Sequence, residues 1–236
     1  MRRTLPRRAA TQGRVQGGLA IAIVWPCAMH VERYASAGRG VAVPRRPCPR
    51  CGAPMIFWSG YERFVRAQGE TLRLWIRRGR YRVCARSHAL IPAFLLARRL
   101  DPHAVIGAAL LRSVSGAGVR TVAGALDVPH TTARDWRRRF RSRAPVLAAG
   151  FSSLAVALGA AAPEVSATPE VAALEALAGA WGQARRRFAD SVPGPFGFAS
   201  VVSGGALLAT TTTPPWAGLF GGGWMPPAHQ RQEIEP

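Results

Sequence analysis

The residues of this chain best suited to chemistry are its cysteines. Cys48 and Cys51 are separated by two residues and followed by Gly52, and Cys84 comes after 32 further residues. Two cysteines at this spacing, with a third beyond a strand-rich stretch, are typical of a zinc ribbon, in which four thiolate or imidazole ligands surround the ion. In a reducing cytosol this pattern predicts a metal site rather than a pair of disulfides.

The fourth ligand is not given by the same pattern. A complete ribbon would place a cysteine at position 87, where this chain has Ser87. His88 is the best substitute, because its imidazole could complete a set of three cysteines and one histidine, and Cys27 is the second choice if the N-terminal strand folds back. The alternative is a degenerate ribbon that has lost its ion and is held by packing. We expect Zn2+ as the cofactor, with the ligands Cys48, Cys51, Cys84 and His88.

The segment from Thr121 to Trp136 has the pattern of a helix-turn-helix. Its first helix has an apolar face in which the small side chain of Ala123 allows a second helix to approach closely. Residues 127–129, Asp-Val-Pro, supply the turn. In the second helix Trp136 and Phe140 fall on one face, so we expect them to point into the core.

The opposite face of this second helix is polar and cationic. In a DNA-binding helix-turn-helix it would enter the major groove, where arginine binds guanine and shorter polar side chains read other base edges. The alternative is a plain three-helix bundle with a solvated basic face. We expect His130, Thr131, Arg134, Asp135, Arg138 and Arg141 to face the bases, and Arg120, Arg137, Arg139 and Arg143 to contact phosphates.

The charge of the chain is concentrated in the part that contains both motifs. The formal net charge is +20, and residues 1–150 hold 28 arginines but only six acidic residues. Codon bias in a GC-rich genome explains why arginine replaces lysine throughout. It does not explain the scarcity of carboxylates, which favours a surface that faces a polyanion such as double-stranded DNA.

The elements that must position these residues predict an α+β fold. Period-2 alternation from Leu72 to Arg77 indicates a strand with one covered and one cationic face, within a strand over 71–83. Further strands are expected over 19–25 and 55–58, with turns at Gly60, Gly69 and Gly79. Helices are expected over 102–114, capped by Asp101, and over 120–126, 131–143, 146–158 and 169–188.

These elements divide the chain into five expected segments. The order is a small β-rich zinc-ribbon-like module, an all-α helix-turn-helix bundle and a low-complexity tail rich in Gly, Pro and Thr. The expected bounds are 1–18 for a flexible basic arm, 19–98 for the ribbon module, 99–158 for the helix-turn-helix domain, 159–190 for a helical segment and 191–236 for a disordered tail.

Four stretches together resemble one family of proteins. These are CPRCG, WSGYERFVR, HALIPAFLLARR and DWRRRF, within the region from Ile21 to Leu158. The combination resembles an uncharacterised family, common in actinobacteria, in which a zinc ribbon precedes a transposase-type helix-turn-helix and which often accompanies insertion-sequence transposases. The resemblance implies a DNA-binding or transposition-linked role, a transposase as a partner, and Cys48, Cys51 and Cys84 as ribbon ligands.

An enzymatic role is the main alternative. A transposase or recombinase that cuts DNA through two divalent ions needs carboxylates that converge, but the acids after Phe140 lie on a helical stripe or in the tail. The tyrosines all fall in the ribbon region, without polar clusters to activate them. We therefore expect no enzyme, although a truncated transposase fragment stays open as an alternative.

The expected location is the cytoplasm, at the nucleoid. A secretory signal is the competing interpretation of the basic residues 1–14 and the apolar run 19–25. That run is too short to cross a membrane and stops at Pro26. A homodimer is possible, with the apolar stripe of the helix over 169–188 either at an interface or against the core.

Overall fold

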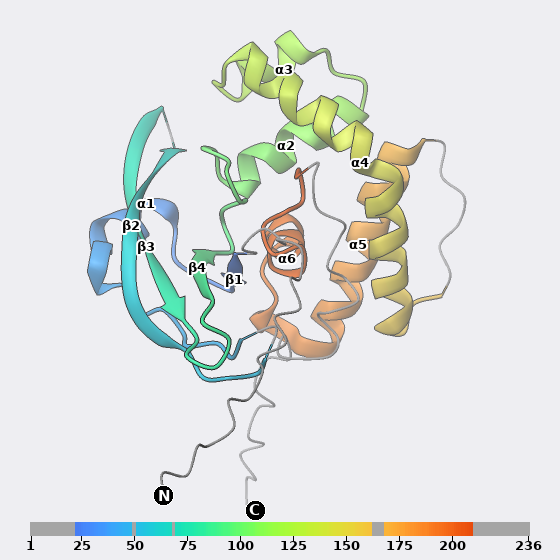
Figure 1. The fold of residues 1–236 in the computed structure, drawn as a ribbon. Coiled ribbons are helices and arrows are strands. Elements are labelled where there is room, and N and C mark those ends of the chain that lie inside the picture. Colours follow the sequence, from blue (N-terminus) through green and yellow to red (C-terminus); the bar gives the residue numbers. More distant parts are fainter. Residues whose placement is uncertain (1–21, 49–50, 68, 162–167, 210–236) are drawn as a thin grey trace, which may run out of the picture.

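The computed structural model describes residues 22–48, 51–67, 69–161 and 168–209, which form a mixed α+β fold (Figure 1). The predicted α+β class is therefore confirmed. The sheet has four strands in the order β1-β4-β3-β2, with β1 parallel to β4 and the other pairs antiparallel. Its strands are β1 (Ile23–Trp25), β2 (Ile56–Ala67), β3 (Glu70–Arg80) and β4 (Ser87–Pro92), and the short helices α1 (Val31–Ala37) and η1 (Gly38–Gly40) lie between β1 and β2.

The β2–β3 hairpin is longer than the sequence pattern predicted. The expected strand over 55–58 continues to Ala67, so the prediction that Gly60 and Gly79 mark turns was wrong. A Cβ on Gly60 would lie 2.5 Å from the Trp75 indole, and one on Gly79 would overlap the Met55 sulfur. These glycines therefore mark close contacts within the strands. Gly69, with a φ of +79°, does lie beside the hairpin turn.

The expected alternation along β3 is confirmed. Leu74 and Ile76 are fully buried in a hydrophobic cluster that also contains Val65 of β2 and Leu90 of β4. Arg73, which lies between Leu72 and Leu74, is exposed. One face of the hairpin thus forms part of the core and the other carries cationic side chains.

Helices α2 to α5 follow the predicted order with one difference. Its helices are α2 (His103–Val114), α3 (Val119–Ala125), α4 (His130–Ala157), α5 (Pro169–Phe188), η2 (Ala189–Ser191) and α6 (Pro195–Val202). The two helices expected over 131–143 and 146–158 are one helix, α4, which continues through Pro145. Proline removes one backbone hydrogen bond from a helix, but Pro145 is exposed to solvent. Buried Ala144, Leu147 and Phe151 continue the apolar stripe past it, and this packing against α5 keeps the helix continuous.

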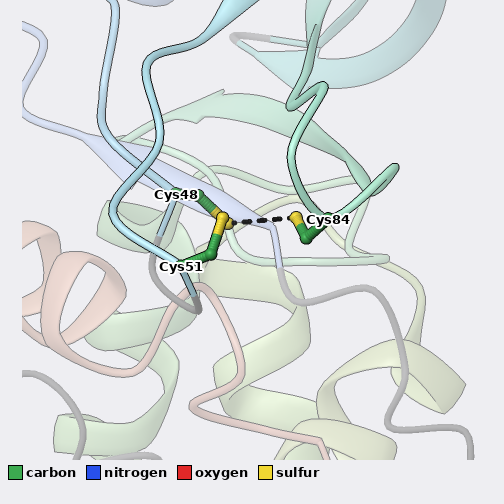
Figure 2. A group of neighbouring side chains, drawn as sticks. All are labelled: Cys48, Cys51 and Cys84. Atoms are coloured by element: carbon green, nitrogen blue, oxygen red, sulfur yellow. Dashed lines mark hydrogen bonds between the residues drawn. The ribbon is translucent and has the colours of Figure 1, made fainter. Parts of the chain in front are cut away.

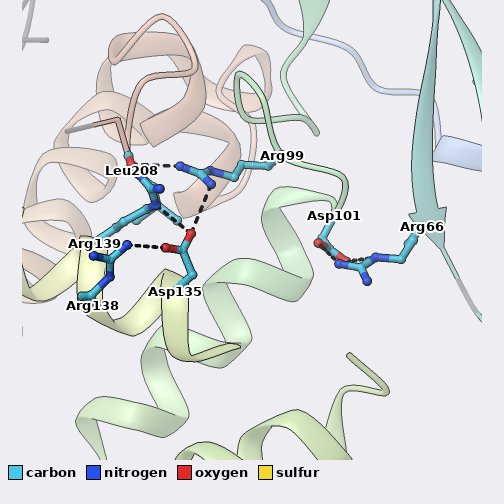
Figure 3. Close-up of polar contacts among 7 residues, drawn as sticks. All are labelled: Arg66, Arg99, Asp101, Asp135, Arg138, Arg139 and Leu208. Carbon is cyan, nitrogen blue, oxygen red and sulfur yellow. Dashed lines mark hydrogen bonds and ion pairs between the residues drawn. The ribbon is translucent and has the colours of Figure 1, made fainter. Parts of the chain in front are cut away.

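Asp101 does not cap α2 as predicted. No side chain caps this helix, and the residue before it is Pro102. The Asp101 carboxylate instead accepts hydrogen bonds from both sides of the Arg66 guanidinium, at 3.0 and 2.7 Å (Figure 3). Since only 2% of the Asp101 side chain is exposed, this bidentate ion pair joins the far end of the hairpin to the start of the helical part.

The prediction of a disordered tail over 191–236 was partly wrong, because residues 191–209 are ordered and contain α6. This helix is buried between the sheet and the other helices (Figure 1). The Ser200 hydroxyl donates to the Leu95 carbonyl at 2.6 Å, and the Ala97 amide donates to the Gly205 carbonyl at 2.8 Å. Residues 210–236 of the predicted tail, and the predicted arm over 1–18, lie outside the described residues.

The apolar side of α5 is covered within the chain. Ala173, Leu177 and Ala180 are buried in the same hydrophobic cluster as the helix-turn-helix segment and α6. None of the helices in the described part of the chain combines the length and the hydropathy that a membrane crossing requires.

His103 should make the stability of the fold depend on pH. It opens α2 and packs against Gly197 of α6, and burial lowers its pKa to about 4. In the unfolded chain the His103 imidazole takes up a proton near pH 6.5. As the pH falls from about 6.5 to 4, the unfolded state is therefore favoured, and the free energy of unfolding should drop by up to about 3 kcal/mol. Chemical denaturation at several pH values checks this, and His103→Gln should flatten the profile. An unchanged profile in that variant would contradict the assignment.

Candidate metal centre and nucleic-acid interface

Three thiols meet at one end of the sheet (Figure 2). The sulfurs of Cys48, Cys51 and Cys84 all lie within 4.8 Å of one another, and the Cys48 and Cys84 sulfurs are 3.6 Å apart. Cys48 is buried, Cys84 is partly exposed and Cys51 is exposed. The chain therefore brings together the cysteines that the sequence pattern singled out.

The first two cysteines belong to a tight loop that precedes β2. The Cys48 amide donates to the Ala53 carbonyl at 2.9 Å, and the Gly52 amide donates to the Cys48 carbonyl at 2.9 Å. Gly52 has a φ of +68°, which glycine adopts without a steric penalty. The Ala53 amide stabilises the Cys51 thiolate. The loop thus turns both of its thiols toward the same point.

The loop that holds Cys84, between β3 and β4, repeats this geometry. The Tyr81 amide donates to the Arg86 carbonyl at 2.9 Å, which again joins residue i to residue i+5. Ala85 has a φ of +54° at the fifth position, where the first loop has Gly52. The Arg86 amide stabilises the Cys84 thiolate, as Ala53 does for Cys51.

This repetition identifies the position that lacks a ligand. Cys84 corresponds to Cys51, and Tyr81 corresponds to Cys48, so the second loop reads Tyr-x-x-Cys where the first reads Cys-x-x-Cys. Tyr81 is fully buried, and its hydroxyl donates to the Arg46 carbonyl at 2.9 Å. Burial, followed by the negative charge of the nearby thiolates, raises the pKa of the Tyr81 phenol. At the place in the loop where a fourth cysteine would stand, Tyr81 is therefore a neutral side chain whose hydroxyl binds a backbone carbonyl.

The predicted fourth ligand is therefore corrected. Ser87 lies beyond the second loop, in β4, where its hydroxyl accepts from Arg78 at 2.9 Å. His88 is buried in the same strand, and its ring packs edge-on against Tyr81 with centroids 5.6 Å apart. It is not part of the thiol group within the described residues, and neither is Cys27. The sequence argument assumed that Cys84 opens the second loop, whereas its backbone hydrogen bonds place it at the fourth position.

The thiols differ in acidity. The Ala53 amide favours the Cys51 thiolate, but desolvation and the two neighbouring thiols outweigh it, and the pKa of Cys51 is raised. For Cys84 the Arg86 amide is the largest influence, and with the neighbouring thiols it lowers the pKa. Such unequal acidities within one cluster allow one thiol to donate a hydrogen bond to another.

The thiol group fits a tetrahedral thiophilic ion. Ligands about 2.3 Å from zinc place neighbouring sulfurs about 3.8 Å apart, and the separation of 3.6 Å between Cys48 and Cys84 matches this value. Three cysteine sulfurs are a soft donor set, which favours Zn2+ or Cu+ over Mg2+ or Ca2+. The cluster is therefore compatible with a metal ion, which the residues on the two loops would hold.

The second candidate site is formed by α3, the following turn and the N-terminal half of α4, above the rest of the molecule in Figure 1. The Val128 amide donates to the Ala123 carbonyl at 3.0 Å, and Asp127 adopts a φ of +49° in the turn. Trp136 and Phe140 are buried with Val122 in one hydrophobic cluster. The expected inward face of α4 is confirmed.

The opposite face of α4 is open to solvent. It begins at the helix N-terminus, where unpaired backbone amides and the helix dipole favour an anion. Of the residues predicted to contact DNA, those that are exposed are Arg120, His130, Thr131, Arg134, Arg137, Arg138 and Arg141, whereas Asp135 and Arg139 are partly exposed and Arg143 is buried.

The prediction that Arg143 contacts phosphate was wrong, because this residue is buried. Only 8% of this residue is exposed, and burial lowers the pKa of its guanidinium. It lies seven residues after Trp136 and four before Leu147, so it shares the inward stripe of α4. In this structure Arg143 is part of the core packing and is not on the surface proposed to contact DNA.

Asp135 is the centre of an ion-pair network (Figure 3). Its carboxylate accepts from Arg139 at 2.6 Å and Arg138 at 2.9 Å, and Arg99 lies 3.4 Å away. Partial burial alone would raise the pKa of Asp135, but the hydrogen bonds from Arg138 and Arg139 and the charge of Arg99 hold it below its usual value. Asp135 thus orients arginines of α4, and both of its carboxylate oxygens already accept a hydrogen bond from them.

Sequence reasoning did not find the contacts that fix the hairpin to the helical part. The Arg63 guanidinium donates to the Leu96 carbonyl at 2.7 Å and also to the carbonyl of Arg99. Arg99 in turn donates to the Leu208 carbonyl at 3.2 Å. The sequence shows these arginines only as charges, and it holds no signal that their side chains bind backbone carbonyls. The network holds the segment before α2 in place beneath α4.

Comparison with protein families, with curated proteins and with solved structures gives no match to this chain.

Proposed function

We propose that this protein binds double-stranded DNA in a sequence-dependent manner through the helix-turn-helix segment α3–α4, in a regulatory or transposition-linked role. One observation carries the proposal: the two faces of the N-terminal half of α4 differ. Trp136 and Phe140 are buried on one face. Arg134, Arg137 and Arg138 are exposed. A net charge of +20 supports binding to a polyanion.

The residues of α4 divide into two roles. Arg134 and Arg138 lie one helical turn apart on the exposed face, at the spacing that reaches base edges in the major groove. Asp135 holds Arg138 and Arg139 through ion pairs. This reduces the side-chain freedom that would be lost on binding and gives Asp135 a positioning role.

Arg120 on α3 and Arg137 on α4 are the exposed cations best placed beside this face to contact phosphates. Such contacts strengthen binding to any sequence and make it depend on salt concentration. Arg141 is also exposed, and it lies 3.4 Å from the Glu170 carboxylate of α5. That pair marks the end of the proposed surface.

We propose that the thiol group holds one Zn2+ with a structural role. The ion would tie the loop before β2 to the loop between β3 and β4, and so fix the end of the sheet. Three thiolates leave one position of the tetrahedron for an exchangeable ligand, such as water. The alternative, a transposase or recombinase that acts catalytically, is favoured by no observation in the described part of the chain.

Arg134→Ala tests the proposed reading face. We expect it to weaken binding to a preferred duplex by about 1 to 3 kcal/mol and to reduce the preference at one or two base pairs. Arg186→Ala, which removes an exposed arginine from α5, should leave the affinity within about twofold. Fluorescence anisotropy with a preferred and a scrambled duplex measures both effects. If Arg134→Ala weakens both duplexes equally, this face does not read sequence.

A further inference from the structure

The outer face of the β2–β3 hairpin combines aromatic rings with arginines. Residues directly opposite one another in an antiparallel pair share a face of the sheet. Phe64 is opposite Arg73, and Gly60 is opposite Arg77. These residues, with Trp75 opposite Glu62, lie on the side away from buried Leu74 and Ile76. We call this face, together with the neighbouring Phe57, Trp58, Arg39, Arg45 and Arg80, the hairpin surface.

Each of three rings on this surface has an arginine stacked on it. The Arg39 guanidinium lies 4.2 Å from the centre of the Trp75 ring. Arg77 lies 5.1 Å from the centre of the Phe57 ring, where Arg45 lies at 5.3 Å. Arg80 lies 5.6 Å from the ring of Trp58, at the bulge in β2. The rings and the charges therefore alternate along the hairpin.

Two rings are strongly exposed. The exposed fraction is 54% for Trp58 and 53% for Phe64, although both side chains are large and apolar. The Trp75 indole packs closely against Gly60, since a Cβ there would be 2.5 Å from the ring. Flat, exposed rings are costly in water, and they offer faces on which another planar group can stack.

The charges on this surface favour a polyanionic partner. Arg73 is the only one of its arginines that forms an ion pair within the described residues, with Glu62 at 3.4 Å, and both side chains are more than half exposed. The remaining arginines lie over rings. Arg39, Arg45 and Arg80 are exposed, and Arg77 donates to the Arg39 carbonyl at 2.8 Å. An apolar protein partner would have to bury these charges without compensation.

We propose that the hairpin surface binds single-stranded DNA. Unstacked bases have planar faces that stack on exposed aromatic rings, and arginines between the rings neutralise the phosphates that connect the bases. A duplex cannot use such a surface, because its bases are already stacked and paired. Phe57 and Phe64 are seven residues apart on β2, which spans about 23 Å and suits a few nucleotides. This activity is separate from the duplex binding proposed for α4.

The test uses the full chain with a thymidine 20-mer and an abasic deoxyribose-phosphate 20-mer of equal charge. Trp58→Ala and Phe64→Ala should each weaken binding to the thymidine 20-mer about tenfold. Neither should change binding to the abasic chain, which has no bases to stack. Val156→Ala, which removes an exposed apolar side chain from α4, is the control and should have no effect. Thermal unfolding of each variant confirms that the fold is retained.

Measuring duplex binding as well distinguishes single-strand binding by the hairpin surface from duplex binding by α4. Arg134→Ala should lose preference for a duplex and still bind the thymidine 20-mer, and Trp58→Ala should show the reverse. The proposal is overturned if the wild type binds the thymidine and abasic chains with equal affinity. It is also overturned if folded Trp58→Ala and Phe64→Ala bind the thymidine 20-mer as tightly as the wild type does.

Discussion

Replacing Trp136 by alanine should lower the free energy of unfolding by about 3 to 5 kcal/mol. The indole is among the largest fully buried side chains, with 2% of the residue exposed, and it belongs to the same hydrophobic cluster as Leu110, Val122 and Phe140. Its removal leaves a cavity where α2, α3 and α4 meet. Because a typical domain is stable by only about 5 to 15 kcal/mol, much of the population would unfold at moderate temperature.

Denaturant unfolding followed by circular dichroism measures this loss. Trp58→Ala is a matched control, since it removes the same ring from an exposed position and should cost less than about 1 kcal/mol. Binding of duplex DNA by Trp136→Ala should recover at low temperature, where the fold is retained. If Trp136→Ala is as stable as Trp58→Ala, the inward face of α4 has been assigned incorrectly.

Replacing Tyr81 by cysteine should raise the affinity for zinc by about 100-fold or more. The two cysteine loops share a backbone hydrogen bond from the amide of residue i to the carbonyl of residue i+5, and Tyr81 is where the second loop lacks its ligand. A thiolate at this position would complete a tetrahedron of four cysteine sulfurs. Loss of a single outer-shell partner typically changes metal affinity by about 10- to 100-fold, so the gain of a direct ligand should be at least as large.

Tyr81→Ser separates ligation from truncation. Both variants remove the buried ring and its hydrogen bond to Arg46, so both should be less stable than the wild type in the presence of a chelator. Only Tyr81→Cys should regain stability when zinc is added. Competition with a chromophoric chelator gives the affinities, and elemental analysis of the wild type should give about one zinc per chain. Equal zinc affinities for the two variants would refute the assignment of position 81.

Much of the fold could be predicted where side-chain spacing reports directly on burial. The alternation of Leu74 and Ile76 with Arg73, Trp75 and Arg77 predicts β3. The spacing of Trp136 and Phe140 predicts the inward face of α4. Both are local patterns, in which neighbours in sequence are also neighbours on one face. The same rule, continued past Pro145 to Leu147 and Phe151, would have shown that α4 is one helix and that Arg143 belongs to its buried stripe.

The remaining features depend on contacts between distant segments. Asp101 has the sequence context of a helix cap, but Arg66, 35 residues earlier in the chain, provides a stronger bidentate partner. Glycines and prolines dominate the composition of the tail, although Phe198, Val201 and Val202 form an apolar run that is buried as α6. A short apolar helix with flanking Gly and Pro can resemble a linker when composition alone is considered.

The metal site also combines a local signal that the sequence shows with a feature that only the fold shows. The first loop is recognisable from Cys-x-x-Cys followed by glycine, which is a local signal. The second loop has Ala85 in the left-handed conformation where glycine is usual, and Tyr81 where cysteine is usual. Neither residue type indicates such a loop in the sequence. The backbone hydrogen bond from Tyr81 to Arg86 matches the one from Cys48 to Ala53 and so aligns Tyr81 with Cys48. The positions of the three sulfurs show that His88 lies outside the thiol group.

The central claim is that the exposed face of α4 reads duplex sequence, and selection of bound fragments from a random duplex library tests it most directly. The wild-type chain should enrich a short motif, and Arg134→Ala should lose the preference at one or two positions of that motif while retaining the rest. Arg186→Ala should enrich the same motif as the wild type. If the wild type enriches no motif, or if Arg134→Ala enriches the complete wild-type motif, α4 does not act as a recognition helix.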